Sequence, residues 1–158
     1  MEYAPKDSYY SVLNTILDSI PSDLFLILNE QKIRVTQEAE KLNIRINFEP
    51  KSYHRQIKVF FPTDLMNDTF KHIFSNMLKY CVSDSINIDI SYKITQDKNG
   101  QNTITLVIQY TGTETDRKST TGGLNKCGEE LEIFEGKLTY SDDPHSDPFK
   151  VTITLLLY

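Results

Sequence analysis

The stretch HIFSNMLKYC, residues 72–81, sets one amide side chain into an otherwise apolar helical pattern. At about 100° per residue, Asn76 falls roughly 130° from the centre of the apolar stripe, and His72, one turn earlier, lies beside it. Asn76 is therefore predicted to face away from the core. Its amide oxygen suits a hard cation such as magnesium, whereas an Asn/His pair on a solvated helix face needs no ligand. The stripe itself consists of Phe70, Ile73, Phe74, Met77, Leu78 and Cys81.

Other residue types that carry out chemistry form no recognisable site in the sequence. The spacing of His, Cys and Asp fits no zinc site, and no Ser stands in a nucleophile elbow. Asp142 and Asp143 are adjacent in a segment typical of a turn. His54 and His145 stand in connecting segments, where we expect solvated side chains. No catalytic residue is therefore predicted.

Cys81 and Cys127 are the only two cysteines, and they are far apart in apolar helical patterns. This pattern favours buried free thiols over a disulfide or a metal site. No stretch reaches the roughly 18 apolar residues of a membrane helix, and the first residues lack a signal-peptide core. We therefore expect a cytoplasmic segment outside the membrane.

The composition fits one globular domain: 158 residues, 39% of them hydrophobic and 25% charged. The formal net charge is -5, and the 17 Lys and Arg residues are spread along the chain. Nucleic-acid binders usually concentrate their basic residues. A nucleic-acid partner is therefore not expected.

The periodicity of apolar residues changes several times along the chain. Near-four spacing predicts helices and alternation predicts strands. Asp23 or Ser22 is expected to cap the second helix, and Thr63 or Asp64 the third. The core face of the second helix is predicted to use Phe25, Leu28, Ile33, Val35, Ala39 and Leu42. The predicted order is helix 8–20, helix 24–42, strands 44–48 and 57–61, a helix after residue 63, strands 86–94 and 104–110, a helix over 124–136, and strands 137–140 and 149–157.

This order of elements predicts a two-layer α+β sandwich with all helices on one face of the sheet. DKNG, residues 97–100, is expected to form the hairpin turn between the two clearest strands. The segment 111–123 has no apolar side chain larger than a threonine methyl, which indicates a mobile surface loop.

Four segments in this order resemble the ATP-binding domain of sensor histidine kinases, whose fold is shared with type II topoisomerases and ATP-driven chaperones. FKHIFSNMLKYC is similar to the asparagine box of that family, LVIQYTGTE to the first glycine box, and TTGGLNKCGEELEIFEGKL to the second. LNEQKIRVTQEAEKLNIRINF is similar to the helix and first strand that enter the domain. The resemblance implies an ATPase domain with a mixed sheet over residues 24–158. Residues 1–23 would then be the tail of a dimerising helical hairpin, and the chain a homodimer.

The resemblance also implies roles for particular residues in binding ATP and magnesium. Asn76 would hold the magnesium ion, and Lys79 matches a lysine that commonly follows. Gly122 and Gly123 would offer backbone amides to phosphate. Arg117 lies in the loop that covers the triphosphate. Gly112 matches a glycine of the first glycine box.

Two departures from the family pattern weaken the nucleotide site. Tyr110 stands where the family has the aspartate that accepts a hydrogen bond from the adenine amino group. Glu114 replaces a glycine and adds negative charge near any triphosphate. None of the three histidines stands in a phosphoacceptor motif. Binding of ATP and magnesium is therefore expected to be weak or absent.

Three functions remain open on the sequence alone. The first is a degenerate ATPase domain that acts as a signalling or protein-interaction module with a protein partner in a two-component-type pathway. The second is a divergent but active histidine kinase-type phosphotransferase domain. The third is an unrelated α+β binding domain.

Overall fold

The computed structural model of the chain describes residues 20–81, 83–112, 121–141 and 148–158. The predicted helix over residues 8–20 therefore lies outside the described residues, apart from its last residue. Most of the predicted 111–123 loop and most of the 141–148 turn also lie outside them.

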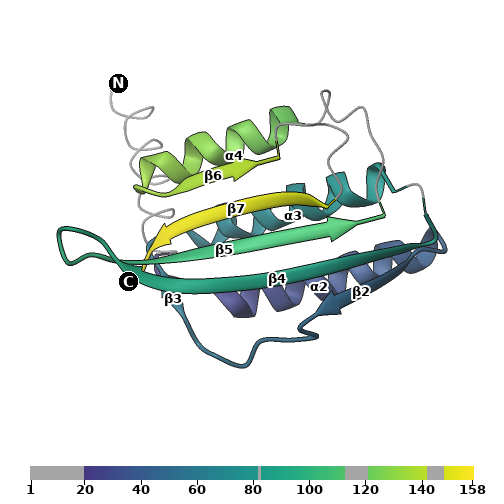
Figure 1. The fold of residues 1–158 in the computed structure, drawn as a ribbon, viewed down its shortest axis with the longest axis horizontal. Coiled ribbons are helices and arrows are strands. Elements are labelled where there is room, and N and C mark those ends of the chain that lie inside the picture. Colours follow the sequence, from purple (N-terminus) through teal and green to yellow (C-terminus); the bar gives the residue numbers. More distant parts are fainter. Residues whose placement is uncertain (1–19, 82, 113–120, 142–147) are drawn as a thin grey trace, which may run out of the picture.

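The predicted two-layer α+β sandwich is confirmed (Figure 1). Its five-stranded sheet has the order β2-β4-β5-β7-β6. β2 runs parallel to β4, and the other neighbours are antiparallel, so the sheet is mixed. Three helices cover one face of it (Figure 1). The elements are α2 (Leu24–Lys41), β2 (Arg45–Glu49), α3 (Thr63–Lys79), β4 (Ser85–Gln96), β5 (Asn102–Thr111), α4 (Thr121–Ile133), β6 (Lys137–Tyr140) and β7 (Phe149–Leu156).

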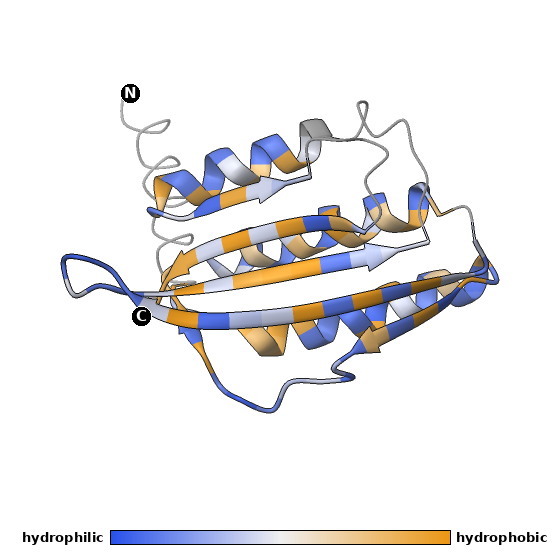
Figure 2. Ribbon diagram, viewed as in Figure 1, coloured by the Kyte–Doolittle hydropathy of each residue, from blue (hydrophilic) through white to orange (hydrophobic). Residues whose placement is uncertain are grey.

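The strands of the sheet show the predicted alternation of buried and more exposed residues, and hydrophobic and hydrophilic residues alternate along β4 (Figure 2). The predicted turn at residues 97–100 joins β4 to β5. There the Asp97 N–H donates to the Gln101 carbonyl at 2.8 Å, and Gly100 has a φ of 80°. This left-handed conformation suits glycine because it lacks a Cβ. The sheet side of the core includes Ile86, Ile88, Ile90, Ile104, Leu106, Ile108, Val151, Ile153 and Leu155.

Helix α2 begins where predicted, because the Asp23 carboxylate accepts a hydrogen bond from the Leu26 N–H at 3.2 Å. The predicted core residues Phe25, Leu28, Val35 and Ala39 are buried. The prediction that Ile33 and Leu42 also belong to this core face was wrong, because these two residues are 62% and 58% exposed. Ile33 lies about 140° around the helix from Leu28, and Leu42 follows the last helical residue.

Lys32 takes the core-facing position next to Ile33 and is only 4% exposed. Its ammonium group donates to the carbonyl oxygens of Pro50 and Lys51 at 3.1 and 2.6 Å. It also lies 4.7 Å from the centre of the Phe48 ring. Burial lowers the pKa of Lys32, since desolvation disfavours the charged form. These contacts hold the connection after β2 against α2.

Helix α3 carries the predicted apolar stripe: Phe70, Ile73, Phe74, Met77 and Leu78 are all buried. The prediction that Thr63 or Asp64 caps it was wrong. Pro62 is the N-cap residue, and its carbonyl accepts from the Met66 N–H at 3.0 Å. Proline suits this place because its fixed φ favours the extended backbone before a helix.

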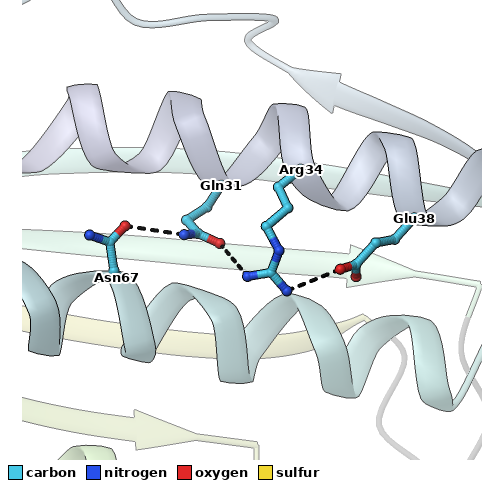
Figure 3. A network of polar contacts seen from close by, with 4 residues as sticks. All are labelled: Gln31, Arg34, Glu38 and Asn67. Atoms are coloured by element: carbon cyan, nitrogen blue, oxygen red, sulfur yellow. Dashed lines mark hydrogen bonds and ion pairs between the residues drawn. The ribbon is translucent and has the colours of Figure 1, made fainter.

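Polar side chains join α2 to α3 along their exposed sides (Figure 3). Gln31 donates to the side-chain oxygen of Asn67 at 3.1 Å and accepts from Arg34 at 3.2 Å. Arg34 also forms an ion pair with Glu38 at 3.1 Å. Because the side chains of Arg34 and Glu38 remain 37% and 42% exposed, this pair adds little stability. Of these three contacts, the bond between Gln31 and Asn67 is the one that joins the two helices.

The strand predicted over residues 57–61 is reduced to β3 (Lys58–Val59) and lies outside the main sheet. It pairs with β1 (Ser22–Asp23) in a separate two-stranded sheet. A backbone bond from the Phe61 N–H to the Val59 carbonyl at 2.9 Å ends the extended stretch. Ile57, Val59 and Phe61 are nevertheless buried, so the alternation reflects burial more than strand length.

Candidate functional site

One end of the sandwich gathers the segments that carry the predicted site residues. Helix α3 ends there and β4 begins, β5 ends and β7 begins, and α4 begins (Figure 1). Helix α4 starts at Thr121, so Gly122 and Gly123 belong to its first turn rather than to a loop. The structure thus brings the asparagine-bearing helix and both glycine segments to a common edge.

His72 connects helix α3 to the start of α4. A Cβ placed on Gly123 would lie 3.1 Å from Nδ1 of His72, so the imidazole ring lies directly against this backbone. Asn76 follows His72 by one helical turn and is half-buried, as expected for the side of α3 away from its apolar stripe. Asn76 is therefore one turn from the residue that contacts the first turn of α4.

Gly112 follows the last residue of β5 in a conformation that other residues rarely adopt, with a φ of 93°. A Cβ at this position would lie 2.5 Å from the carbonyl oxygen of Ser85, at the start of β4. The close approach and the positive φ each require glycine. Gly112 thus allows the end of β5 to lie close to the start of β4.

Tyr110 is 3% exposed and shares the inner side of β5 with Ile108 and Leu106. Its ring packs against Phe149 with 5.4 Å between centroids, and Phe149 in turn stacks on Tyr140 at 6.4 Å. The Tyr140 hydroxyl donates to the side-chain oxygen of Asn125 in α4 at 2.8 Å. A row of three rings therefore crosses β5, β7 and β6, and its last ring is bonded to α4.

Fewer contacts are known for the remaining predicted site residues. Lys79 is exposed in the last turn of α3, with its ammonium group 5.5 Å from the centre of the Tyr80 ring. Gly122 lies in the first turn of α4. Arg117 and Glu114 lie outside the described residues.

The groups available at this edge are backbone amides and one side-chain amide. The first turn of α4 offers backbone N–H groups and positive potential, which favour an anion. Asn76 would supply a single oxygen ligand, and magnesium usually keeps waters and phosphate oxygens for its other positions. Within the described residues, no group of three or more His, Cys, Asp or Glu side chains is placed to hold a metal ion.

Three surface hollows among the described residues have linings that do not include Asn76, Tyr110 or Gly123. Two lie along α2, and the third lies on the sheet beside Asn87 and Gln109.

The sequence did not reveal Phe149, Tyr140 or the contact of His72 with Gly123. Phe149 faces Tyr110 because the two residues are partners in the β5–β7 register. The sequence does place aromatic residues at the ends of these two predicted strands. It does not show that the two strands pair, because they are far apart in the sequence.

Both cysteines carry free thiols, as predicted, but the prediction that both are buried was wrong for Cys81, which lies beyond the last residue of α3. Cys127 is buried between α4 and α3, and Cys81 is half-buried. Burial is the main cause that raises the pKa of Cys127, so the thiol is held in its unreactive protonated form.

Solved structures of histidine kinases share this arrangement. A mycobacterial sensor histidine kinase, MprB, aligns with a TM-score of 0.56 at 13% identity, covering 87% of this chain and 97% of that chain. The ATP binding domain of PrrB from Mycobacterium tuberculosis gives 0.56 at 10% identity, covering 88% and 97%. Acinetobacter baumannii histidine kinase AdeS gives 0.54 at 11% identity, covering 87% and 65%.

The chain therefore has the histidine kinase-type ATPase fold. No protein-family model matches the sequence, and no curated protein matches it. Within the described residues, no helix combines the length and apolarity needed to cross a membrane.

Proposed function

We propose that this chain is a histidine kinase-like ATPase domain whose nucleotide site has degenerated, and that it acts as a signalling or protein-interaction module. The fold supports the kinase-like class. The single observation that carries the degenerate assignment is the buried ring of Tyr110, which packs against Phe149. This ring stands at the position that the family resemblance assigns to the base-reading aspartate.

Two physical effects of Tyr110 oppose adenine binding. A buried tyrosine ring covers about 150 to 250 Å², so a base entering between sheet and helices would have to displace it. A phenol also cannot replace the carboxylate as a charged acceptor for the adenine amino group. Losing such a buried partner typically costs about 1 to 3 kcal/mol.

The phosphate side of the proposed site is better preserved. Asn76 would bind magnesium, Lys79 and Arg117 would neutralise phosphate charge, and backbone amides of Gly122 and Gly123 would donate to phosphate oxygens. Gly112 would position the connecting segment. His72 would give this site an imidazole beside the phosphates.

The second candidate is a divergent but active phosphotransferase domain that acts on a histidine elsewhere. The preserved phosphate side favours it, and PrrB, one of the similar structures, is described as an ATP binding domain. For this chain the alternative requires the Tyr110 ring to swing out of its packed position when nucleotide binds.

A comparison of magnesium-ATP with magnesium-tripolyphosphate tests the proposal, because only ATP carries a base. We expect both ligands to shift the amide resonances of Asn76 and Gly123 in the same concentration range, above about 1 mM. The expectation follows from a site that retains phosphate contacts and lacks base contacts. Two-dimensional NMR on the labelled chain gives the measurement. Saturation by ATP at concentrations at least tenfold lower than tripolyphosphate would support the active alternative instead.

We also propose a reducing, cytoplasmic setting. Free thiols at Cys81 and Cys127 support it, since disulfides predominate in oxidising compartments.

A further inference from the structure

A hollow of about 380 Å³ lies between α2 and the connection from β2 to β3, away from the edge that holds Asn76 and Gly123. Ten described residues line it, among them Lys32, Ile33, Phe48, Lys51, Tyr53 and His54. Its size lies within the range of sites that accept a small ligand or a large side chain. It is the one hollow of the three that borders a strongly exposed apolar side chain, that of Ile33.

The apolar wall of this hollow is built before any partner binds. Tyr53 stacks on Phe25 with 4.5 Å between ring centroids, and its hydroxyl donates to the Ile90 carbonyl. The side chain of Asn29 donates to the Tyr53 carbonyl at 2.9 Å. These contacts hold the Tyr53 ring in place, so an entering apolar group would not have to order it.

The charges around the hollow have one sign. Of its ten lining residues none is acidic, whereas Lys32 lies in its wall and Lys51 and His54 are also lining residues. Between Glu49 and Asp64 the sequence has three Lys or Arg residues and no Asp or Glu, although the whole chain carries -5. The β2–β3 connection is correspondingly hydrophilic (Figure 2). This segment is therefore a basic surface on an acidic domain.

Lys32 does not need a further counter-ion to stay in this wall. Its ammonium group already donates to two carbonyl oxygens and faces the rings of Phe48 and Tyr53. Its charge is nevertheless uncompensated by any acidic lining residue. An acidic group brought to the rim by a partner would thus meet positive potential from Lys32 and Lys51. Arg55 follows the lining residue His54 in the sequence and adds a further positive charge to this segment.

We propose that this hollow is a docking site for a protein partner that inserts one apolar side chain from an acidic segment. The apolar side chain packs on Ile33, Phe48 and Tyr53, and the flanking carboxylates face Lys51 and Arg55. An exposed isoleucine next to a preformed aromatic wall is the arrangement of an interface anchor site. The surface is separate from the nucleotide edge, so its function does not depend on whether ATP binds.

Selection from a random twelve-residue peptide library on the folded chain provides the probe. We expect enriched peptides to share one large apolar residue flanked by Asp or Glu. Fluorescence anisotropy of a synthetic peptide from this set then measures affinity. Ile33→Asp should weaken binding at least tenfold, because it removes the anchor contact and adds repulsion. Ile33→Ser serves as a second variant with the same expected direction.

Two matched controls separate the hollow from general effects. Leu42→Asp changes a similarly exposed apolar residue outside the hollow and should leave affinity within twofold. Lys51→Glu with Arg55→Glu should weaken binding at least tenfold at low salt, with a smaller loss at high salt. Lys93→Glu with Lys98→Glu makes the same charge change at other exposed positions and should have little effect.

Several outcomes overturn the proposal. They are a failure to enrich any peptide, enrichment of basic or uncharged peptides, and equal binding by the wild type and Ile33→Asp. A second copy of the chain is the other occupant to consider. Sedimentation showing a dimer that Ile33→Asp dissociates would mean that the hollow is a self-association surface, and would also overturn it.

Discussion

Replacing Tyr110 with Asp should increase magnesium-ATP binding by at least tenfold over the wild type, alone or combined with Glu114→Gly. The substitution removes the ring that packs on Phe149 and supplies a carboxylate at the position of the base-reading aspartate. A charged hydrogen bond to the adenine amino group contributes about 1.5 to 3 kcal/mol, which corresponds to tenfold or more in affinity. Calorimetry on the purified variants measures the effect.

Tyr110→Ala is the matched control for this gain. It opens the same space without an acceptor, so it should bind ATP more weakly than Tyr110→Asp. Removing a buried ring costs stability, about 3 to 5 kcal/mol for large-to-alanine changes. Circular dichroism must therefore show that each variant is folded. A folded Tyr110→Asp protein that binds no better than Tyr110→Ala would contradict the role assigned to this residue.

Gly112→Ala is expected to destabilise the domain by about 3 kcal/mol. A φ of 93° is strained for any residue with a Cβ, and the new methyl would lie 2.5 Å from the Ser85 carbonyl oxygen. Backbone strain of this kind costs about 1 to 3 kcal/mol, and overpacking adds about 1 to 3 kcal/mol. Relief would require the end of β5 to move away from the start of β4. Urea unfolding followed by circular dichroism measures the loss.

Gly128→Ala provides the control for Gly112. Gly128 lies inside α4, and a Cβ there would meet nothing closer than the Leu138 Cβ at 3.9 Å. Alanine is the better helix former by about 0.5 to 1 kcal/mol, so this variant should be slightly more stable than wild type. Equal stability of Gly112→Ala and wild type would show that the close approach to Ser85 is not a constraint.

Local patterns were sufficient to predict most of the fold. The apolar stripe of α3 and the alternation in β4 and β5 depend on neighbouring residues alone, and both were predicted correctly. The turn at Gly100 was also predictable, because its conformation depends on the local sequence.

The errors concern features that depend on distant parts of the chain. Ile33 has the more apolar side chain, yet Lys32 faces the core because the carbonyl oxygens of Pro50 and Lys51 receive its ammonium group. Likewise, β3 pairs with β1 and meets the end of β7 only through an isolated bridge between Val59 and Leu157. Neither partner can be identified from the periodicity of the segment itself.

In the candidate site, too, some features follow from the local sequence and others depend on distant parts of the chain. The positions of Asn76 on the outer side of α3 and of Tyr110 on the inner side of β5 follow from helical and strand geometry. The packing of Tyr110 on Phe149, and of His72 on Gly123, follows from the strand register and the helix arrangement. These contacts could be found only in three dimensions.

Calorimetric titration of the unmodified chain with a non-hydrolysable ATP analogue and magnesium tests the degenerate assignment most directly. Tyr110 occupies the inner side of β5 and packs against Phe149, so we predict no saturable binding below about 1 mM, equivalent to less than about 4.1 kcal/mol of binding free energy. Saturable binding with a Kd in the micromolar range would contradict the account and favour an active kinase domain.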